Sequence, residues 1–532
     1  MAKRATAAAF SSILLDEASP EPLYRQVYSR LRTAILMRQL PPGTRLPSTR
    51  ELANELNISR NTVMNAYDQL LAEGYLEGQV GSGTFVSLAL PDDLLQARAS
   101  TRGTKKLSPV GRGLSRRGQL LANTRAAVTP ILGKARPLLP GRPAFDEFPI
   151  SVWSSLVTRH WEHVSTRMLD YGEAAGYRPL REAIAAYLSL SRAVQCAPDQ
   201  VIVVSGTQQA LDLAARVLLD PGDSVWMEEY SYLAAQAALV GAGAKLISIP
   251  VDDEGLNCSS NAPTAIPRLI YVTPSHQYPL GVTMSLPRRL ALLDCANRFA
   301  AWILEDDYDS EYRYVGRPLA ALQGLDTEGR VIYLGTFSKA LFPSLRLGYM
   351  VVPQDLVTAF EAARATAGWC SPIVEQAVLA DFINEGHFAR HIRRMRALYA
   401  ERQRVLVGTL DRECEGLLDT RGDDAGIHLT AWLSDPLDER EVVRQAAQRG
   451  VKVQPLSSFA VDSEKQTRKG LVLGYGAYDV DQIKEAAVKL AAAVRATASA
   501  TVVHPKTSKA IPNTNSRRRK ARFQDDRHLA DT

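Results

Sequence analysis

Short, continuous apolar runs alternate with amphipathic segments over residues 136–500. Between the runs, apolar residues recur at helical spacing, so this pattern predicts strands and helices in turn. Strands that are apolar throughout are typical of a mostly parallel sheet that helices cover on both faces. The pattern therefore predicts an α/β domain over this part of the chain. The predicted strands are Val201–Val204, Ser224–Met227, Leu246–Ile249, Leu269–Val272, Trp302–Leu304, Val331–Leu334 and Gly348–Val352.

The first 88 residues follow another pattern, in which three helical segments precede two short strands. Ser48 is placed to cap the second helix, and Glu51, three residues on, completes a capping box. The third helix begins after Ser59 and ends at Gly74. A helix–turn–helix followed by a β-hairpin is the plan of a winged-helix domain of the α+β class. The predicted elements are the helices Pro22–Leu40, Ser48–Leu56 and Ser59–Ala72 and the strands Tyr75–Leu76 and Thr84–Val86.

The two patterns predict a multi-domain chain, since 532 residues exceed what one ordinary core holds. Between Arg98 and Arg125 the chain has eight basic residues and no acidic one. This composition predicts a flexible linker, with extra contacts to DNA phosphates as the alternative. The predicted division is an N-terminal arm over 1–19, a winged helix over 20–88, a basic linker over 89–135, an α/β domain over 136–500 and a basic, disordered tail over 501–532.

Charge is distributed unevenly along the chain. Residues 1–130 hold 17 Lys and Arg against 10 Asp and Glu, and residues 504–532 hold 8 against 3. Because the net charge of the whole chain is +6, residues 131–503 carry a net charge of −6. A basic front joined to an acidic body predicts a nucleic-acid-binding module attached to a different kind of domain.

The cysteines and the hydropathy narrow the class of protein further. The five cysteines lie far apart without a Cys-x-x-Cys pair. This argues against a disulfide framework or a zinc site, and it predicts a cytoplasmic protein without a metal. No apolar run reaches the roughly 18–20 residues that a membrane helix needs, so we expect no membrane partner. The N-terminus, where Asp16 and Glu17 follow a weak apolar stretch, is interpreted as an arm and not as a signal peptide.

Lys339 is the residue around which candidate chemistry gathers. A lysine amine forms a Schiff base with an aldehyde such as pyridoxal phosphate (PLP), whose phosphate, ring nitrogen, ring face and ring oxygen each need a partner. Ser205-Gly206-Thr207 follows an apolar strand and opens a helix near Gln208, so backbone N–H groups there can hold an anion. Thr336-Phe337-Ser338 precedes the lysine, and Arg346 lies seven residues after it. Hydroxyls and a guanidinium suit a phosphate dianion.

An acidic segment supplies the candidate partner for the ring nitrogen. Five of the seven residues from Glu305 to Glu311 are acidic, and they follow the predicted strand Trp302–Leu304. Asp306 is the candidate carboxylate, and Tyr308, two residues on, projects to the same side and can donate to the ring oxygen. A solvated acidic loop is the alternative, and charge alone does not favour Asp306 over Asp307.

The winged-helix segment resembles the GntR family over most of residues 20–87. PPGTRLPSTRELA and GYLEGQVGSGTFV match the family's helix–turn–helix and wing patterns in order. Short polar residues at the start of the third helix can meet base edges and phosphates in the major groove. For a single polar residue such as Asn61, a solvated helix face is the alternative. The resemblance implies that Arg45, Arg50, Ser59, Arg60, Asn61, Thr62 and Gly81 contact double-stranded DNA.

The segments SGTQQAL, TPSHQYPLG, EDDYDSEYRY and GTFSKALFPSLRLGY resemble the fold-type I aminotransferase domain of MocR/GabR-type regulators in order and spacing. The likeness covers roughly residues 140–495 and implies a homodimer. It implies PLP bound as a Schiff base to Lys339, Asp306 on the pyridine nitrogen and Tyr308 on the ring oxygen. His276 and Pro279 belong to a loop nearby. The implied cofactor-binding residues are Gly206, Thr207, Gln208, Tyr232, Tyr278, Asp306, Tyr308, Ser338, Lys339 and Arg346, with Tyr232 stacked on the ring and Gly206, Thr207, Ser338 and Arg346 around the phosphate.

Two positions depart from the family's pattern. Tyr230 stands where the family's Glu-x-Pro-Gly-Tyr has its proline, and Val472 stands where many relatives and true aminotransferases carry a carboxylate-binding arginine. A ligand held by two arginines is therefore in doubt. Arg468 is close in sequence, but the alternation of side chains along a strand does not make it a substitute.

The combination predicts a DNA-binding transcriptional regulator that holds PLP on Lys339 and senses an amine-bearing effector, such as an amino acid, or PLP itself. An active PLP-dependent aminotransferase with an attached DNA-binding domain is the alternative, because the lysine can serve as both Schiff base and proton shuttle. A third possibility is a large domain that acts only as a dimerisation scaffold, which the full set of cofactor residues disfavours.

Overall fold

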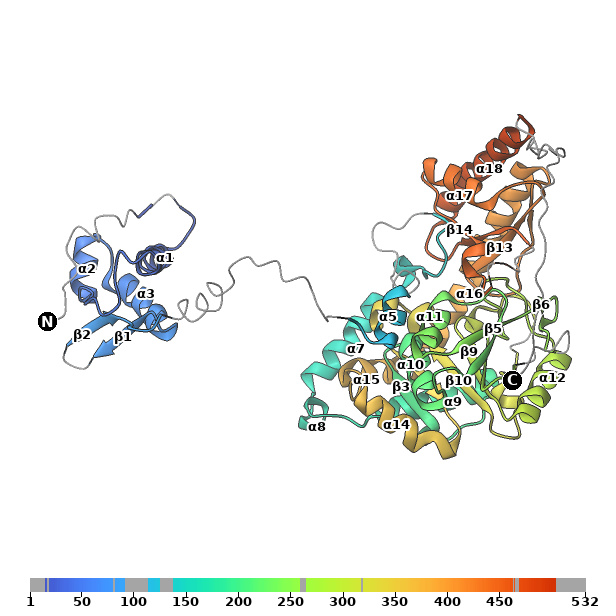
Figure 1. Cartoon of the computed structure of the whole chain (residues 1–532), viewed down its shortest axis with the longest axis horizontal. Helices are drawn as coiled ribbons and strands as arrows, with labels where there is room; N and C mark the ends of the chain where they lie inside the picture. The colour runs from blue at the N-terminus through green and yellow to red at the C-terminus, as the bar shows by residue number, and fades with distance from the viewer. Residues whose placement is uncertain are drawn as a thin grey trace, which may run out of the picture. The chain divides into compact units, whose positions relative to one another are not determined.

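The computed structural model describes residues 15–16, 19–79, 82–90, 113–124, 137–258, 265–316, 319–462, 464 and 468–503. The chain forms two compact units, Met1–Gly113 and Leu114–Thr532 (Figure 1). Within the described residues, no helix is both long enough and apolar enough to cross a membrane. The predicted tail lies outside the described residues from 504 on.

The N-terminal unit has the predicted winged-helix order of three helices and a hairpin. Ser48 Oγ accepts from the backbone N–H of Glu51, whose carboxylate accepts from the N–H of Ser48, so the predicted capping box is confirmed. The first helix is shorter than its apolar pattern, because a turn over residues 37–40 precedes Pro41. Val27, Leu31 and Val63 lie in one buried core that joins the elements. These elements are α1 (Leu23–Leu36), α2 (Thr49–Glu55), α3 (Arg60–Ala72), β1 (Leu76–Gln79) and β2 (Gly83–Val86).

A seven-stranded sheet forms the centre of the second unit, in the order β3-β11-β10-β9-β8-β4-β5. Only β11 pairs antiparallel with its neighbours, so the predicted mostly parallel sheet is confirmed. The strand β9 continues through Asp307, whereas the apolar run that predicted it ends at Leu304. Its last three residues are acidic, which is why hydropathy missed them. The strands are β3 (Val201–Val204), β4 (Ser224–Glu228), β5 (Lys245–Ile249), β8 (Leu269–Val272), β9 (Trp302–Asp307), β10 (Val331–Thr336) and β11 (Gly348–Val351).

Helices cover both faces of this sheet. Leu211 of α10, Leu239 of α11 and Phe360 of α14 share one buried cluster with residues of one face. Leu292 of α12 and Ile184 of α9 lie in the clusters of the opposite face. Because helices bury both faces of the sheet, its strands are apolar throughout and appear in the sequence as continuous apolar runs. The helices are α7 (Ile150–Glu162), α8 (Thr166–Leu169), α9 (Arg178–Arg192), α10 (Thr207–Leu218), α11 (Leu233–Ala242), α12 (Leu286–Phe299), α13 (Phe337–Ala340), α14 (Val357–Thr366) and α15 (Ile373–Asn384).

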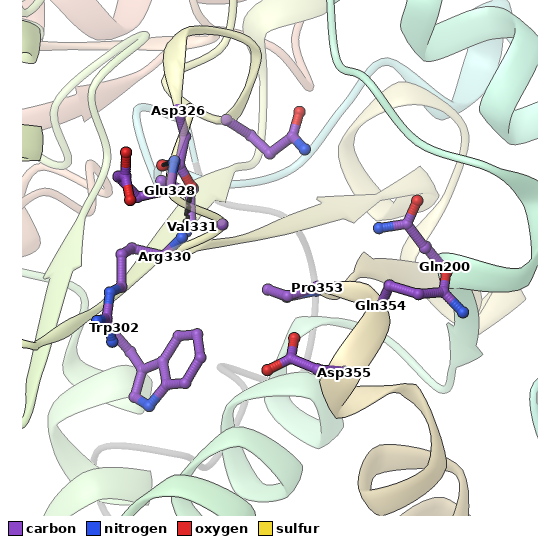
Figure 2. A pocket seen from close by; sticks show the side chains of 11 residues that line it. Gln200, Trp302, Asp326, Glu328, Arg330, Val331, Pro353, Gln354 and Asp355 are labelled. Carbon is purple, nitrogen blue, oxygen red and sulfur yellow. Dashed lines mark hydrogen bonds between the residues drawn. The ribbon is translucent and has the colours of Figure 1, made fainter. Parts of the chain in front are cut away.

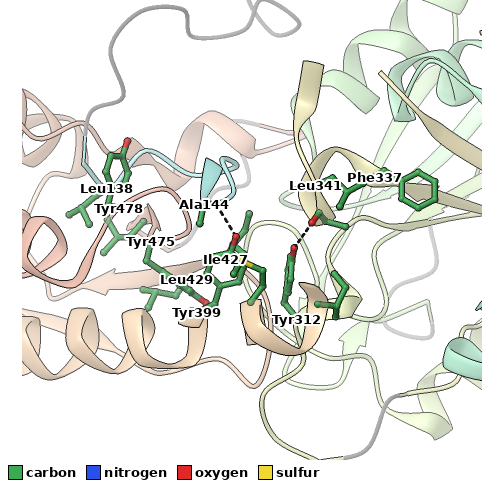
Figure 3. Packing of buried hydrophobic residues seen from close by; sticks show 14 of the residues in the cluster. Leu138, Ala144, Tyr312, Phe337, Leu341, Tyr399, Ile427, Leu429, Tyr475 and Tyr478 are labelled. Atoms are coloured by element: carbon green, nitrogen blue, oxygen red, sulfur yellow. Dashed lines mark hydrogen bonds between the residues drawn. The ribbon is translucent and has the colours of Figure 1, made fainter. Parts of the chain in front are cut away.

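The C-terminal part adds a four-stranded antiparallel sheet packed with long helices, which we call the C-terminal lobe. Figure 3 shows the buried cluster where this lobe meets the segment around Ala144 and the end of β10. The Tyr399 hydroxyl accepts from the backbone N–H of Ala144 at 2.9 Å, and the Tyr312 hydroxyl donates to the carbonyl of Lys339 at 3.0 Å. The lobe contains α16 (His387–Cys414), β12 (Leu418–Thr420), β13 (His428–Leu433), α17 (Glu439–Gln448), β14 (Gln454–Pro455), β15 (Gly470–Gly474) and α18 (Val480–Val503), and β6 (Val251–Asp252) pairs with β7 (Gly255–Leu256) elsewhere.

The predicted flexible linker contains a helix, α5 (Arg116–Asn123), which differs from the prediction. Ser115 caps this helix, and its Oγ accepts from the N–H of Gly118. The helix packs on α11 at Gly241, where an added Cβ would lie 2.6 Å from Leu121 Cδ2. The remaining linker residues, 91–112 and 125–136, lie outside the described residues. Two leucines in a basic, polar stretch were too weak a signal to predict a docked helix.

Candidate functional site

The carboxyl ends of β3, β9 and β10 meet at one edge of the large sheet, and the candidate residues lie there. The turn at Gly206 follows β3, Asp306 is the last residue but one of β9, and Lys339 lies in α13 directly after β10. The carboxyl ends of parallel strands are where open α/β sheets bind ligands. The fold thus brings together segments that are far apart in the sequence.

Lys339 is half-buried at this edge, and its Nζ donates to the carbonyl oxygen of Gly141 at 2.6 Å. Burial lowers the pKa of the lysine, and the carboxylates of Asp309 and Asp306 oppose that shift without cancelling it. A lysine with a lowered pKa has a larger fraction of free amine, which is the form that attacks an aldehyde. Gly141 was missed by sequence reasoning, because no pattern marks a carbonyl acceptor.

Asp306 and Asp307 point to opposite faces of β9, and their surroundings differ. Asp306 Oδ2 accepts from the Tyr271 hydroxyl at 2.8 Å, whereas its Oδ1 is buried and has no hydrogen-bond partner among the described residues. Burial raises the pKa of Asp306 to about 7. The nearby Lys339 acts in the opposite direction. An unpartnered buried carboxylate oxygen is costly unless a ligand donates to it.

Asp307 is instead engaged within the protein. Its Oδ2 accepts from Arg192 Nε at 2.9 Å, from the Tyr333 hydroxyl at 2.5 Å and from Ser310 Oγ at 2.8 Å. Its Oδ1 also has no partner in the described part of the chain, but the charge of this carboxylate is already balanced by a buried guanidinium. Geometry therefore distinguishes the two aspartates where charge alone did not, and Asp306 is the one on the side of Lys339.

The turn at Gly206 has the shape of an anion site. Gly206 caps α10 with a φ of 104°, and the helical ladder begins only with the N–H of Gln209 and Ala210 donating to its carbonyl. A Cβ at this position would lie 3.4 Å from Arg346 Nη1, so the guanidinium faces the open turn. Gln208 turns away, since its amide donates to the carbonyl of Ala234 at 3.2 Å. Ser338 lies beside the lysine, and its N–H donates to Thr336 Oγ1.

Aromatic side chains form a wall beside these groups. The ring centroid of Tyr278 lies 5.9 Å from that of Tyr232 and 5.6 Å from that of Tyr308, with the planes nearly perpendicular. Burial raises the pKa of Tyr232 to about 12, so this phenol stays neutral. The Tyr308 hydroxyl donates to the carbonyl oxygen of His276 at 3.0 Å. Sequence reasoning placed His276 in the neighbourhood but did not predict this bond.

The two departures from the family pattern lie in one apolar cluster. Val472 is fully buried and packs with Tyr230, Leu280 and Phe459, and Tyr278 packs against the same cluster. The guanidinium of Arg468 lies 3.4 Å from the centroid of the Trp432 ring, a stacked position on β13. Arg468 therefore does not take the place of a cation at position 472.

The predicted DNA-contact residues cluster at the starts of α2 and α3 and beside the hairpin. Arg50, Arg60 and Asn61 are exposed, while Ser59 and Thr62 cap α3 through the Ser59 Oγ and the Thr62 N–H at 3.1 Å. Arg45 is exposed, and its guanidinium lies against Gly83 of β2. Gly81 lies outside the described residues. Met64 and Asn65 are exposed one turn after Arg60 and Asn61 on the same helix, and they were not among the predicted contacts.

A polar pocket of about 510 Å³ lies at the opposite edge of the sheet (Figure 2). It is lined by the first residues of β9 and β10, among them Trp302 and Val331, and by Asp326, Arg330 and Asp355. Asp326 accepts from the backbone N–H groups of Arg330 and Val331, which closes the turn before β10. This pocket lies at the amino ends of β9 and β10, whereas Lys339 follows the carboxyl end of β10.

Comparison with known families accounts for both units. Residues 23–86 match the model of bacterial regulatory proteins of the gntR family, and residues 149–490 match that of aminotransferase class I and II. The chain is 46% identical to the probable rhizopine catabolism regulatory protein MocR of Rhizobium meliloti, over 89% of this chain and 94% of the relative. It belongs to the MocR-type regulators of the GntR family. It is also 31% identical to the pyridoxine biosynthesis transcriptional regulator PdxR of Corynebacterium glutamicum, over 91% of this chain and 98% of the relative.

MocR-type regulators join a DNA-binding winged helix to a PLP-dependent domain, and the comparisons confirm the predicted fold class and cofactor. Kynurenine aminotransferase of Pyrococcus horikoshii, solved with PMP, superposes with a TM-score of 0.64 at 28% identity, covering 76% of this chain and 99% of that one. The GntR part implies DNA binding, and the aminotransferase-like part implies a small-molecule ligand.

The residues at the edge of the sheet fit this cofactor. Asp306 Oδ1 is a buried acceptor that no described residue satisfies and that a protonated pyridine nitrogen would satisfy. The open turn at Gly206 and the guanidinium of Arg346 match a phosphate. The Lys339 amine is held close by, at the carbonyl of Gly141. The acceptor, the anion site and the amine are thus all present on one side of the sheet.

Proposed function

We propose that this MocR-type regulator holds PLP on Lys339 as a Schiff base and uses its occupancy to change DNA binding. The observation that carries the proposal is the buried Asp306 Oδ1, which lies on the same side of the sheet as Lys339 and has no hydrogen-bond partner within the ranges that the structure describes. In the proposed arrangement Asp306 accepts from the pyridine nitrogen and Tyr308 faces the ring oxygen. Tyr232 covers the ring, with Tyr278 beside it. The phosphate is bound by the turn at Gly206 and Thr207 together with Gln208 N–H, Ser338 and Arg346.

Electrostatics supports the role of Asp306. A carboxylate that accepts from the ring nitrogen holds the proton there and keeps the ring poor in electrons, which is what PLP chemistry requires. In return, the ring nitrogen donates to Asp306 Oδ1 and so removes the free-energy cost of burying this oxygen without a hydrogen bond. The free energy of cofactor binding therefore includes relief of a destabilised buried carboxyl, and binding is expected to stabilise the domain.

For the DNA-binding unit we propose contacts from Arg50, Arg60 and Asn61 to base edges and phosphates, because these side chains are exposed at the starts of α2 and α3. Ser59 and Thr62 are proposed to offer their hydroxyls to phosphates, and Arg45 a charge. Gly81 stays a prediction. We further propose a homodimer that works in the cytoplasm, where the DNA is, since DNA-binding regulators with paired half-sites are commonly dimers.

The proposed effector is an amine-bearing small molecule or PLP itself, and α11 offers a route for its signal. Tyr232, proposed to stack on the cofactor, is the N-cap of α11, and α5 of the linker packs on the same helix at Gly241. A tilt of the ring that displaces Tyr232 would move the surface on which α5 docks. Such a route is a coupling only if the effector binds the two DNA-binding states with different affinity.

An active aminotransferase is the second candidate, because Lys339 has a lowered pKa and is available as a base. The apolar surroundings of Val472 count against it for ordinary α-amino acids, whose carboxylate needs a cation or several donors. The two candidates differ in turnover. Addition of an amino acid and a keto acid should give no more than one equivalent of product per site if the domain is only a sensor.

The visible spectrum of the purified protein tests the cofactor assignment. A Schiff-base band is expected in the wild type and in Lys245→Ala, which removes an exposed lysine on β5, but not in Lys339→Ala. A band that survives in Lys339→Ala would overturn the assignment of the lysine, and no band in the wild type would overturn cofactor binding. Gel shifts with and without PLP then test whether the loaded site changes DNA binding.

A further inference from the structure

His276 lies at the centre of a buried polar cluster that the proposed function does not use. It is 2% exposed, in the loop that follows β8. Its Nδ1 lies 3.1 Å from Asp309 Oδ2 and 3.0 Å from the Tyr308 hydroxyl, and its carbonyl oxygen accepts from that hydroxyl at 3.0 Å. Both the main chain and the ring of His276 therefore contact the one phenol that faces the proposed ring oxygen.

The other side of the imidazole faces the C-terminal lobe. His276 Nε2 lies 3.6 Å from Asp423 Oδ2, and neither atom has a hydrogen-bond partner among the residues that the structure describes. The ring of His428, on β13, lies with its centroid 4.9 Å from that of His276. The groups that face His276 are thus two carboxylates, one phenol and one second histidine, contributed by both lobes.

The charges in this cluster favour an imidazolium at His276. Burial alone would lower the pKa of His276, but the carboxylates of Asp309 and Asp423 outweigh it and raise the pKa to about 10. The pKa of His428 shifts in the opposite direction, because burial and the charge of His276 hold it well below the usual value. These opposite shifts favour a cation at His276 and a neutral imidazole at His428.

The Tyr308 phenol has a single proton and two oxygen partners to choose from. In the structure the proton is directed at the carbonyl of His276. An anionic ring oxygen on a bound cofactor would compete for it, and a positive N–H beside the phenol oxygen makes that phenol a better donor. Because Asp309 and Asp423 flank the imidazole ring, its Nδ1 stays beside the phenol oxygen.

We infer that His276 is a positioning residue, which holds the Tyr308 hydroxyl against the cofactor's ring oxygen and so sets how readily the Schiff base on Lys339 loses its proton. The inference rests on the proposed function, since it needs a cofactor on that lysine. A donor to the ring oxygen stabilises the negative charge that remains there when the Schiff base is deprotonated. Loss of His276 is therefore expected to make the Schiff base keep its proton to higher pH.

The test is a spectrophotometric pH titration of the full-length, PLP-loaded protein. His276→Gln is expected to raise the pH of the spectral midpoint by roughly one unit, the size of one lost charge interaction at partly screened distance. The same substitution in a Tyr308→Phe background is expected to shift the midpoint much less, because the phenol through which it acts is gone. His160→Gln, which removes a partly buried histidine paired with Asp381, is the matched control and should leave the midpoint unchanged.

Two results would overturn the inference while leaving the cofactor assignment intact. One is an unshifted midpoint in His276→Gln, and the other is an equal shift with and without Tyr308, which would mean a direct charge effect. Absence of the band in the wild type would instead count against the proposed function. If thermal melting shows His276→Gln to be unfolded, His276→Asn, whose amide lies near the place of Nδ1, runs the same cycle and is expected to shift the midpoint in the same direction.

Discussion

Replacement of Asp306 by asparagine should separate the stability of the empty domain from its affinity for PLP. In the structure this carboxyl is buried and accepts one hydrogen bond from Tyr271, and its other oxygen has no partner in the described ranges. Asparagine keeps an acceptor for Tyr271 and removes the charge. The cofactor-free variant is therefore expected to be more stable than the cofactor-free wild type, although it binds PLP more weakly.

The size of this stability difference and its dependence on pH follow from the raised pKa of Asp306. An aspartate whose pKa rises from 3.8 to about 7 on folding is destabilising when ionised. The penalty is absent below the unfolded pKa, grows by about 1.4 kcal/mol per pH unit between the two values and is constant above the folded one, where it reaches about 4 kcal/mol. The advantage of Asp306→Asn should therefore widen by roughly 2–3 kcal/mol between pH 5 and pH 8.5.

Denaturant unfolding followed by tryptophan fluorescence measures this directly. All six tryptophans lie beyond residue 150, so the signal reports the α/β unit and not the winged helix. Asp220→Asn, which changes an exposed loop carboxylate far from Lys339 in the sequence, is the control. A stability difference that is the same at both pH values, or a less stable asparagine variant at pH 8.5, would refute the reasoning.

Three further predictions concern phosphate, DNA and the linker. Arg346→Ala should weaken PLP binding about 10- to 100-fold in an absorbance titration, as expected for lost charge-assisted hydrogen bonds, whereas Arg216→Ala on the exposed side of α10 should not. Arg60→Ala should weaken DNA binding in a fluorescence-anisotropy titration by about tenfold, with an unchanged Schiff-base band, and Arg25→Ala should have a smaller effect. Leu121→Asp should release α5 from Gly241, because the Leu121 side chain packs there, and it should speed proteolysis of the linker and abolish the response of DNA binding to PLP, whereas Leu114→Asp, before the start of α5, should not. An unchanged response in Leu121→Asp would rule out the route through α11.

Sequence patterns predicted those elements whose structure depends on neighbouring residues. The capping box at Ser48 and the helical spacing of α3 follow from neighbouring residues, and the structure has both. Strands such as Val201–Val204 are apolar throughout because both of their faces are covered, so hydropathy located them to the residue. The acidic end of β9 was not predicted as part of the strand, because Asp306 and Asp307 are buried by partners that lie elsewhere in the chain.

The parts of the candidate site that sequence could not predict depend on contacts across the fold. Charge left Asp306 and Asp307 equivalent, and only the partner on each face of β9 distinguishes them: Tyr271 on one, Arg192 on the other. The carbonyl of Gly141 on Lys339 has no side chain to reveal it. His276 was recognised as near the site from its motif, but its bond to Tyr308 required coordinates.

The central claim is that occupancy of the Lys339 site changes DNA binding. It is tested most directly by measuring the affinity of one protein preparation for the DNA beside its own gene in three states: without PLP, with PLP, and with PLP after hydroxylamine has broken the Schiff base. The spectrum is recorded in the same samples. The account predicts affinities that differ at least about fivefold between states, in step with the Schiff-base band. Equal affinities in all three states, despite a band that appears and disappears, would contradict it.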